Sequence, residues 1–165
     1  MYLKYLLVSV FVLAAAVATA QSVKSAPSFQ LTGVTDTVAL SAYKGRVVYV
    51  DFWASWCSPC KDSFPWMNKM QAKYADQGFV VIAINVDRKQ DDAYEFLSKE
   101  AVNFPVAFDH KGDTPKQYEV MGMPSAYVIG KDGNILHAHI GFNTDDTAEY
   151  EKHIQQALSL KGSVQ

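Results

Sequence analysis

Residues 46–60 read RVVYVDFWASWCSPC and carry the only two cysteines of the chain, Cys57 and Cys60. The quoted stretch begins with a nearly continuous apolar run, which is typical of a strand buried on both faces of a sheet that helices cover. After the cysteines, apolar side chains recur at helical spacing, at Phe64, Met67 and Met70. The pattern therefore predicts that the two cysteines lie where a buried strand passes into a helix.

The composition and the first residues of the chain bound its domain organisation. The chain has 165 residues, of which 49% are hydrophobic and 19% charged, and this suits one globular domain with one core. Residues 1–20 combine Lys4, an apolar run and the small residues Ala18 and Ala20, so we expect a signal peptide, with an uncleaved N-terminal anchor as the alternative. Residues 21–165 then form the domain. The net charge of −2 gives no electrostatic case for nucleic-acid binding.

Three kinds of site could use a pair of cysteines with this spacing. A structural disulfide between Cys57 and Cys60 would close a very small loop and would constrain the unfolded chain little. A structural zinc site needs four ligands, and the sequence has no second cysteine pair. His137 and His139 alternate on one strand face and could bind a metal ion, but two histidines alone are an incomplete site. We expect that strand face to be exposed to solvent instead. In an exported protein a redox centre is therefore the favoured interpretation.

The helix that follows the cysteines would affect their reactivity. Cys57 would lie at the helix N-terminus, where free backbone N–H groups and the helix dipole lower the pKa of a thiol. Pro59 suits the first helical turn, whereas Pro65 should kink the helix. Cys60 would lie one turn further on. The pattern thus predicts an exposed, acidic first thiol and a shielded second thiol.

The rest of the chain alternates between strand and helix patterns. We expect strands at residues 79–86, 106–109, 125–130 and 134–141. We expect helices at residues 91–101, 114–120 and 144–160. The turn Lys131-Asp132-Gly133-Asn134 joins the last two strand patterns, and an Asp-Gly turn in that position indicates a β-hairpin.

Several motifs resemble those of thioredoxins. VDFWASWCSPCK (50–61) resembles their active-site strand and motif, and MGMPSAYVIGKDGNI (121–135) resembles their second signature. Residues 26–60 and 103–142 are similar to the exported TlpA-like (ResA-like) branch of that superfamily. The resemblance covers residues 26–158. It implies an α/β thioredoxin fold: a central mixed sheet with helices on both faces, an N-terminal β-hairpin and an extra strand-helix insertion.

The resemblance implies a role for each residue around the cysteines. Cys57 would be the attacking thiol and Cys60 the resolving thiol, and Pro124 would follow a cis peptide bond beside them. The implied substrate-binding residues are Trp56, Ser58, Pro59 and Met123. Trp56 would cover the motif, with an ordinary partly buried aromatic as the alternative, and for Met123 and Met121 the alternative is a core residue.

Asp51 occupies the position of the buried acid of thioredoxins. A carboxyl group buried beside the motif has a raised pKa, disfavours a second anion nearby when it is charged, and could take the proton from Cys60. The lysine that partners this acid in cytoplasmic thioredoxins is replaced here by Ala83, and Ser63 stands where some exported relatives have a glutamate. A solvated or helix-capping aspartate is the alternative interpretation.

These residues predict a thiol-disulfide oxidoreductase that needs no metal and no organic cofactor. Ser58 and Pro59 place no positive charge between the cysteines, and Asp51 opposes a thiolate, so we expect a reductant of disulfides. A general disulfide oxidase or isomerase would use the same residues. A thioredoxin-like copper chaperone would add a histidine to the two cysteines, and both alternatives stay open.

The leader-like segment suggests where the protein works and with what. We expect export to the bacterial periplasm or an equivalent oxidising compartment, a monomeric protein, and electrons supplied by a membrane-bound donor. The expected partners are disulfide-containing exported proteins. The sequence does not decide between an apocytochrome c, as in cytochrome c maturation, another thiol oxidoreductase, and a broad set of exported proteins.

Overall fold

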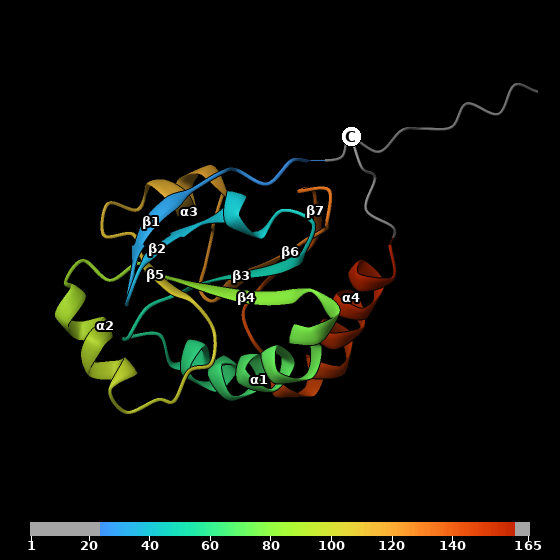
Figure 1. Cartoon of the computed structure of the whole chain (residues 1–165). Helices are drawn as coiled ribbons and strands as arrows, with labels where there is room; N and C mark the ends of the chain where they lie inside the picture. The colour runs from blue at the N-terminus through green and yellow to red at the C-terminus, as the bar shows by residue number, and fades with distance from the viewer. Residues whose placement is uncertain (1–23, 161–165) are drawn as a thin grey trace, which may run out of the picture.

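The computed structural model describes residues 24–160, which form a seven-stranded sheet with helices on both faces (Figure 1). The strands are β1 (Gln30–Gly33), β2 (Thr37–Ala39), β3 (Val47–Trp53), β4 (Phe79–Asn85), β5 (Val106–Phe108), β6 (Ser125–Ile129) and β7 (Ile135–Ile140). The α-helices are α1 (Ser58–Tyr74), α2 (Gln90–Leu97), α3 (Asp113–Gln117) and α4 (Thr147–Ser159). Within residues 24–160, no helix has the length and apolar character needed to cross a membrane. The predicted signal peptide, residues 1–20, lies outside the described residues.

The sheet has the strand order β2-β1-β5-β4-β3-β6-β7. The strand β3 runs parallel to β4, ending in the pair Trp53↔Asn85, and antiparallel to β6, beginning with the pair Phe52↔Ser125. The strands β1 and β2 form an antiparallel hairpin, and β1 joins the sheet beside β5. The predicted mixed sheet, N-terminal hairpin and additional strand and helix, β5 and α3, are therefore confirmed.

Every residue of β3 and β4 is buried, because cores form on both faces of the sheet. On one face α1, α2 and α4 cover the sheet, and the aromatic rings of Trp53, Phe64 and Phe96 pack together at centroid distances of 4.9 to 5.0 Å. The helix α3 lies on the other face (Figure 1). Tyr118, which follows α3, packs there on the rings of Phe52 and Tyr127, with centroid distances of 5.3 and 5.1 Å. Packing on both faces therefore accounts for the continuous apolar run, from which the sequence predicted a strand buried on both sides.

The helix α2 ends at Leu97, four residues before the end that its sequence pattern predicts. The cause is a contact with α1. The side chain of Asn68 donates a hydrogen bond to the carbonyl oxygen of Ala101 at 2.6 Å and accepts one from the backbone N–H of Asn103 at 2.9 Å. A turn follows α2, and residues 101–103 are then held against α1 by Asn68, a contact that local helix propensity does not reveal.

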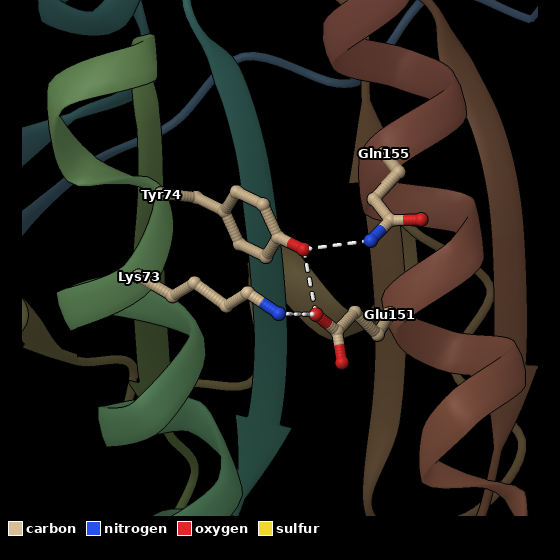
Figure 2. A network of polar contacts seen from close by, with 4 residues as sticks. All are labelled: Lys73, Tyr74, Glu151 and Gln155. Atoms are coloured by element: carbon tan, nitrogen blue, oxygen red, sulfur yellow. Dashed lines mark hydrogen bonds and ion pairs between the residues drawn. The ribbon is translucent and has the colours of Figure 1, made fainter.

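A network of polar side chains joins the end of α1 to α4 (Figure 2). The hydroxyl of Tyr74 donates to Oε1 of Glu151 at 2.6 Å and accepts from Nε2 of Gln155 at 2.8 Å. The ammonium group of Lys73 lies 2.6 Å from the same carboxylate oxygen. Tyr74 is only 4% exposed, whereas the side chain of Lys73 is half exposed. The buried hydroxyl, rather than the solvated ion pair, should therefore carry most of the stabilisation.

Tyr74→Phe removes this hydroxyl while keeping the ring. We expect the free energy of unfolding to fall by about 1 kcal/mol, the usual contribution of one or two such hydrogen bonds. Lys73→Met is the matched control, and its effect should be much smaller because water screens the ion pair. Urea unfolding of both variants measures the difference. An equal loss in both would show that the ion pair stabilises the contact between the helices as much as the buried hydroxyl does.

Candidate active site at the end of strand β3

Cys57 and Cys60 form a disulfide at the start of α1, with an Sγ–Sγ distance of 2.05 Å. Cys57 is the N-cap residue of α1, and Pro59 lies in the first turn, as the sequence predicts. The expectation of an exposed first thiol is wrong for this disulfide state, because Cys57 is only 5% exposed and Cys60 is fully buried. Cys57 packs with the core beneath α1, although it remains the more accessible of the two.

Pro124 lies at the same edge of the sheet as the disulfide. It immediately precedes Ser125, which pairs with Phe52 near the end of β3, and the Met123–Pro124 peptide bond is cis as expected. The carbonyl oxygen of Pro124 accepts a hydrogen bond from the backbone N–H of Gly141 at 2.7 Å. Met123 is half-buried and packs against the core below α1. Its core contact is thus real, and its role in binding substrate stays a prediction.

The other predicted substrate-binding residues surround the disulfide and are exposed. Ser58 and Pro59 face solvent, and the Trp56 residue is 69% exposed. The interpretation of Trp56 as a partly buried aromatic is therefore wrong, because its ring finds no core beside the turn that carries it. A large apolar side chain left exposed next to a reactive disulfide is suited to contact a partner.

Asp51 lies in the core below the start of α1. The residue is 1% exposed, and its Oδ2 atom has no hydrogen-bond partner among residues 24–160. Its strand neighbours Ala83 and Ala126 carry only methyl groups. Burial raises the pKa of Asp51 well above its ordinary value. The solvated or capping interpretation of Asp51 is therefore wrong. The hydroxyl of Ser63 does not supply the missing hydrogen bond to Asp51, because it donates to the carbonyl oxygen of Cys60 at 2.8 Å.

His139 lies under α4 and not on an exposed face. Its Nδ1 atom is 3.0 Å from the carbonyl oxygen of Gly141 and must carry the hydrogen, so Nε2 accepts from the hydroxyl of Tyr49 at 3.0 Å. Its ring stacks on Tyr150 with the centroids 4.1 Å apart. Burial lowers the pKa of His139 and raises that of Tyr49. Both groups are therefore neutral at pH 7, and the pair acts as a neutral hydrogen bond beside Asp51.

His137 occupies the same face of β7 and is also covered. Its ring stacks on that of His153 in α4, with the centroids 3.9 Å apart, so the predicted exposed strand face is wrong for both histidines. Burial and the neighbouring His153 lower the pKa of His137. Among the side chains that the structure describes, no three His, Cys, Asp or Glu residues are arranged to hold a metal ion.

Two polar residues at the end of β4 were not singled out from the sequence. Asn85 and Asp87 are buried, and the carboxylate of Asp87 accepts a hydrogen bond from the backbone N–H of Ser55, two residues before Cys57. One sequence signal could have found them. Polar residues that directly follow a buried parallel strand lie at the sheet edge where α/β proteins place their sites.

Comparison with known proteins agrees with this geometry. The Redoxin family matches residues 21–154. The chain belongs to the Redoxin family. The thiol-disulfide oxidoreductase ResA of Bacillus thuringiensis subsp. konkukian is 34% identical over 133 residues, which cover 79% of this chain and 77% of that protein. The family, this relative and the paired cysteines identify the activity as thiol-disulfide oxidoreduction.

Solved structures support the same conclusion for this Redoxin-family chain. A Chlorobium tepidum crystal structure assigned as a thiol:disulfide interchange protein DsbE is 50% identical, with a TM-score of 0.82 over 83% of this chain and 97% of that one. The thioredoxin domain of a Bacteroides vulgatus thiol-disulfide oxidoreductase is 23% identical, with a TM-score of 0.71 over 79% of this chain and 96% of that one. The predicted thioredoxin fold is therefore confirmed.

The pH dependence of stability should report the burial of Asp51. The folded state holds the Asp51 proton more tightly than the unfolded state does, so this group lowers stability as the pH rises above about 4, the ordinary pKa of aspartate. Asp51→Asn cannot lose a proton. We expect its stability relative to the natural protein to rise by up to about 1.4 kcal/mol for each pH unit above that value. Urea unfolding of the oxidised proteins at pH 4 and pH 7 measures this change.

Asp109→Asn is the matched control, because Asp109 is a buried aspartate with the opposite behaviour. Burial alone would raise its pKa, but hydrogen bonds from Thr114 and Gly112 lower it. Its stabilisation is therefore complete above about pH 4 and is lost on acidification. The Asp109 variant should be less stable than the natural protein at pH 7 and approach it at low pH. If the Asp51 variant gave no change between pH 4 and pH 7, Asp51 would titrate normally.

Proposed function

We propose that the chain is a reductant of disulfides in exported proteins and acts outside the cytoplasm. The observation that carries this proposal is the buried Asp51 on the strand that leads to Cys57. A carboxyl group in this environment disfavours a thiolate nearby, so it makes the reduced form less stable and the pair a better electron donor. Ser58 and Pro59 add no positive charge that would favour the thiolate.

The exchange proceeds in two balanced steps. The Cys57 thiolate attacks one sulfur of the partner's disulfide, that disulfide breaks, and the partner's other sulfur leaves as a thiolate that takes a proton. The deprotonated Cys60 then attacks the Cys57 sulfur, the mixed disulfide breaks, and the second partner thiol leaves. The Cys57–Cys60 disulfide and a partner dithiol result, so two electrons pass to the partner.

Cys57 and Cys60 have separate roles in this scheme. Cys57 is the nucleophile because it caps α1, where the unpaired backbone N–H groups and the helix dipole stabilise an anion, and because it is less buried than Cys60. Cys60 resolves the mixed disulfide. Asp51 accepts its proton in that step, since a carboxylate in this environment readily becomes protonated. Pro124 and Met123 line the edge at which the partner chain binds, and Trp56, exposed in the turn before Cys57, also contacts it.

The compartment and the partners follow from the leader-like sequence and from the chemistry. A dithiol that reduces disulfides in an oxidising compartment has to be recharged, which calls for a membrane-bound donor. The partners are exported proteins with accessible disulfides. An apocytochrome c and another thiol oxidoreductase both meet that description, so a role in cytochrome c maturation is one form of the proposal.

The reduction potential tests the direction of electron flow. We expect equilibration with glutathione to give a potential more negative than about −180 mV, the value of disulfide isomerases. Asp51→Asn should move the potential to a less negative value, because the thiolate then loses its unfavourable neighbour. A potential near −120 mV, that of the strong oxidant DsbA, would instead identify an oxidase.

A cysteine trap tests the order of attack. Reduced Cys60→Ala should accumulate a mixed disulfide with insulin, because Cys57 can attack and nothing resolves the product. Non-reducing electrophoresis detects this species, and dithiothreitol should release it. Cys57→Ala is the control, and it should trap far less insulin because Cys60 is fully buried. Equal trapping by both variants would show that either cysteine can be the nucleophile.

A further inference from the structure

A buried carboxylate holds the turn that precedes Cys57. The Asp87 residue is 2% exposed and follows the last residues of β4. Its Oδ2 atom accepts hydrogen bonds from the backbone N–H of Ser55 at 2.9 Å and from Nδ2 of Asn85 at 2.8 Å. The backbone N–H of Asp87 donates in turn to Oδ1 of Asn85 at 3.0 Å. The two side chains thus support each other, and Ser55 is the group that they hold.

The turn held in this way contains the exposed Trp56 and ends at Cys57. It runs from Ala54 to Cys57 and closes with a hydrogen bond from the Cys57 N–H to the Ala54 carbonyl oxygen at 3.1 Å. Trp56 lies inside it and is 69% exposed, so few neighbours fix its ring. The direction in which Trp56 points, and the way in which it lies relative to Cys57, therefore depend on the backbone of the turn.

The backbone of Asp87 is itself held by another contact. A ring N–H of His110, at Nδ1, donates to the carbonyl oxygen of Asp87 at 2.9 Å, and the His110 ring stacks on Phe108 at the end of β5. The preceding residue, Val86, donates from its backbone N–H to the carbonyl oxygen of Trp53 at 2.9 Å. The contact between Asp87 and Ser55 therefore ties a surface turn to the rigid ends of three neighbouring strands.

We propose that Asp87 is a positioning residue for exchange with protein disulfides. It holds the turn so that Trp56 and Cys57 present one surface to a partner. A protein substrate has to fit against that surface before its disulfide reaches Cys57, whereas a small disulfide needs access to the sulfur alone. The proposal rests on exchange at Cys57 and holds whether the chain donates or accepts electrons.

The test compares two substrates of the reduced protein, insulin and glutathione disulfide. Asp87→Ala removes both hydrogen bonds, and we expect the ratio of its rate constants for insulin and for glutathione disulfide to fall about tenfold, which corresponds to about 1.4 kcal/mol of lost positioning. Asp87→Asn should keep the ratio within about twofold of the natural value, because Oδ2 alone carries both bonds and a carboxamide oxygen can accept both.

Asp109→Ala is the matched control. Asp109 is also buried, follows the neighbouring parallel strand β5, and accepts backbone hydrogen bonds from Gly112 and Thr114 in a turn that leads to α3. A general loss of stability should be similar in both alanine variants, but the substrate ratio should change only for Asp87. Equal loss against both substrates in Asp87→Ala, or the same change of ratio in Asp109→Ala, would overturn the proposal. So would a failure of Asp87→Asn to restore the ratio.

A second measurement tests the proposal even if Asp87→Ala does not fold. In the natural protein and in Asp87→Asn, the backbone amide of Ser55 should exchange its hydrogen slowly with solvent, although it lies in a surface turn. Exchange of this amide at the rate of an unprotected amide would show that Asp87 does not hold the turn. The potential against glutathione is independent of this result, so the direction of electron flow and the role of Asp87 fail separately.

Discussion

The site depends on one constraint: β3 has a parallel neighbour on one side and an antiparallel neighbour on the other. Because β4 runs parallel to β3, the two strands end at the same edge, which brings Asp87 beside the turn that leads to Cys57. Because β6 runs antiparallel, it begins at that edge, and the residue before it is Pro124. Segments that are 30 to 70 residues apart in the chain thus meet at the start of α1. A sheet with only parallel strands would bring strand ends to this edge but would place the start of β6 at the far one.

The sequence predicts the elements that carry the cysteines well, because their burial is complete. β3 and β4 are covered on both faces, so their apolar runs needed no assumption about which face was inside. The edge strand β7 is different. Its histidines alternate as an exposed polar face would, and only the packing of α4 shows that His137 and His139 are covered by rings. Coverage of an edge strand is set by a helix that comes later in the chain, and a local pattern holds no information about it.

Two buried aspartates show why residue type and burial alone do not determine a pKa. Asp109 and Asp51 are both nearly inaccessible, but the pKa of Asp109 is lowered and that of Asp51 is raised. Asp109 follows a strand, where a turn offers the free N–H groups of Gly112 and Thr114. Asp51 lies inside a strand, where the sheet already uses the backbone N–H groups. The sequence predicted Asp51 next to the cysteines from its position in the strand. Only the structure shows that, among residues 24–160, its Oδ2 atom has no hydrogen-bond partner.

Within residues 24–160, the buried side-chain atoms that lack a hydrogen-bond partner all belong to this strand. Among residues 24–160, the buried side-chain nitrogen and oxygen atoms without a hydrogen-bond partner are Oδ2 of Asp51 and Nε1 of Trp53, and both belong to β3 just before the disulfide. Each such atom costs about 1 to 3 kcal/mol, so the fold gives up stability where its chemistry occurs. For the carboxyl group this has a functional meaning. Firm hydrogen-bond donors would fix Asp51 as a carboxylate, as they fix Asp109, and it could not then accept a proton readily. Left without them, Asp51 has a raised pKa, which suits the role of proton acceptor from Cys60 that we propose for it.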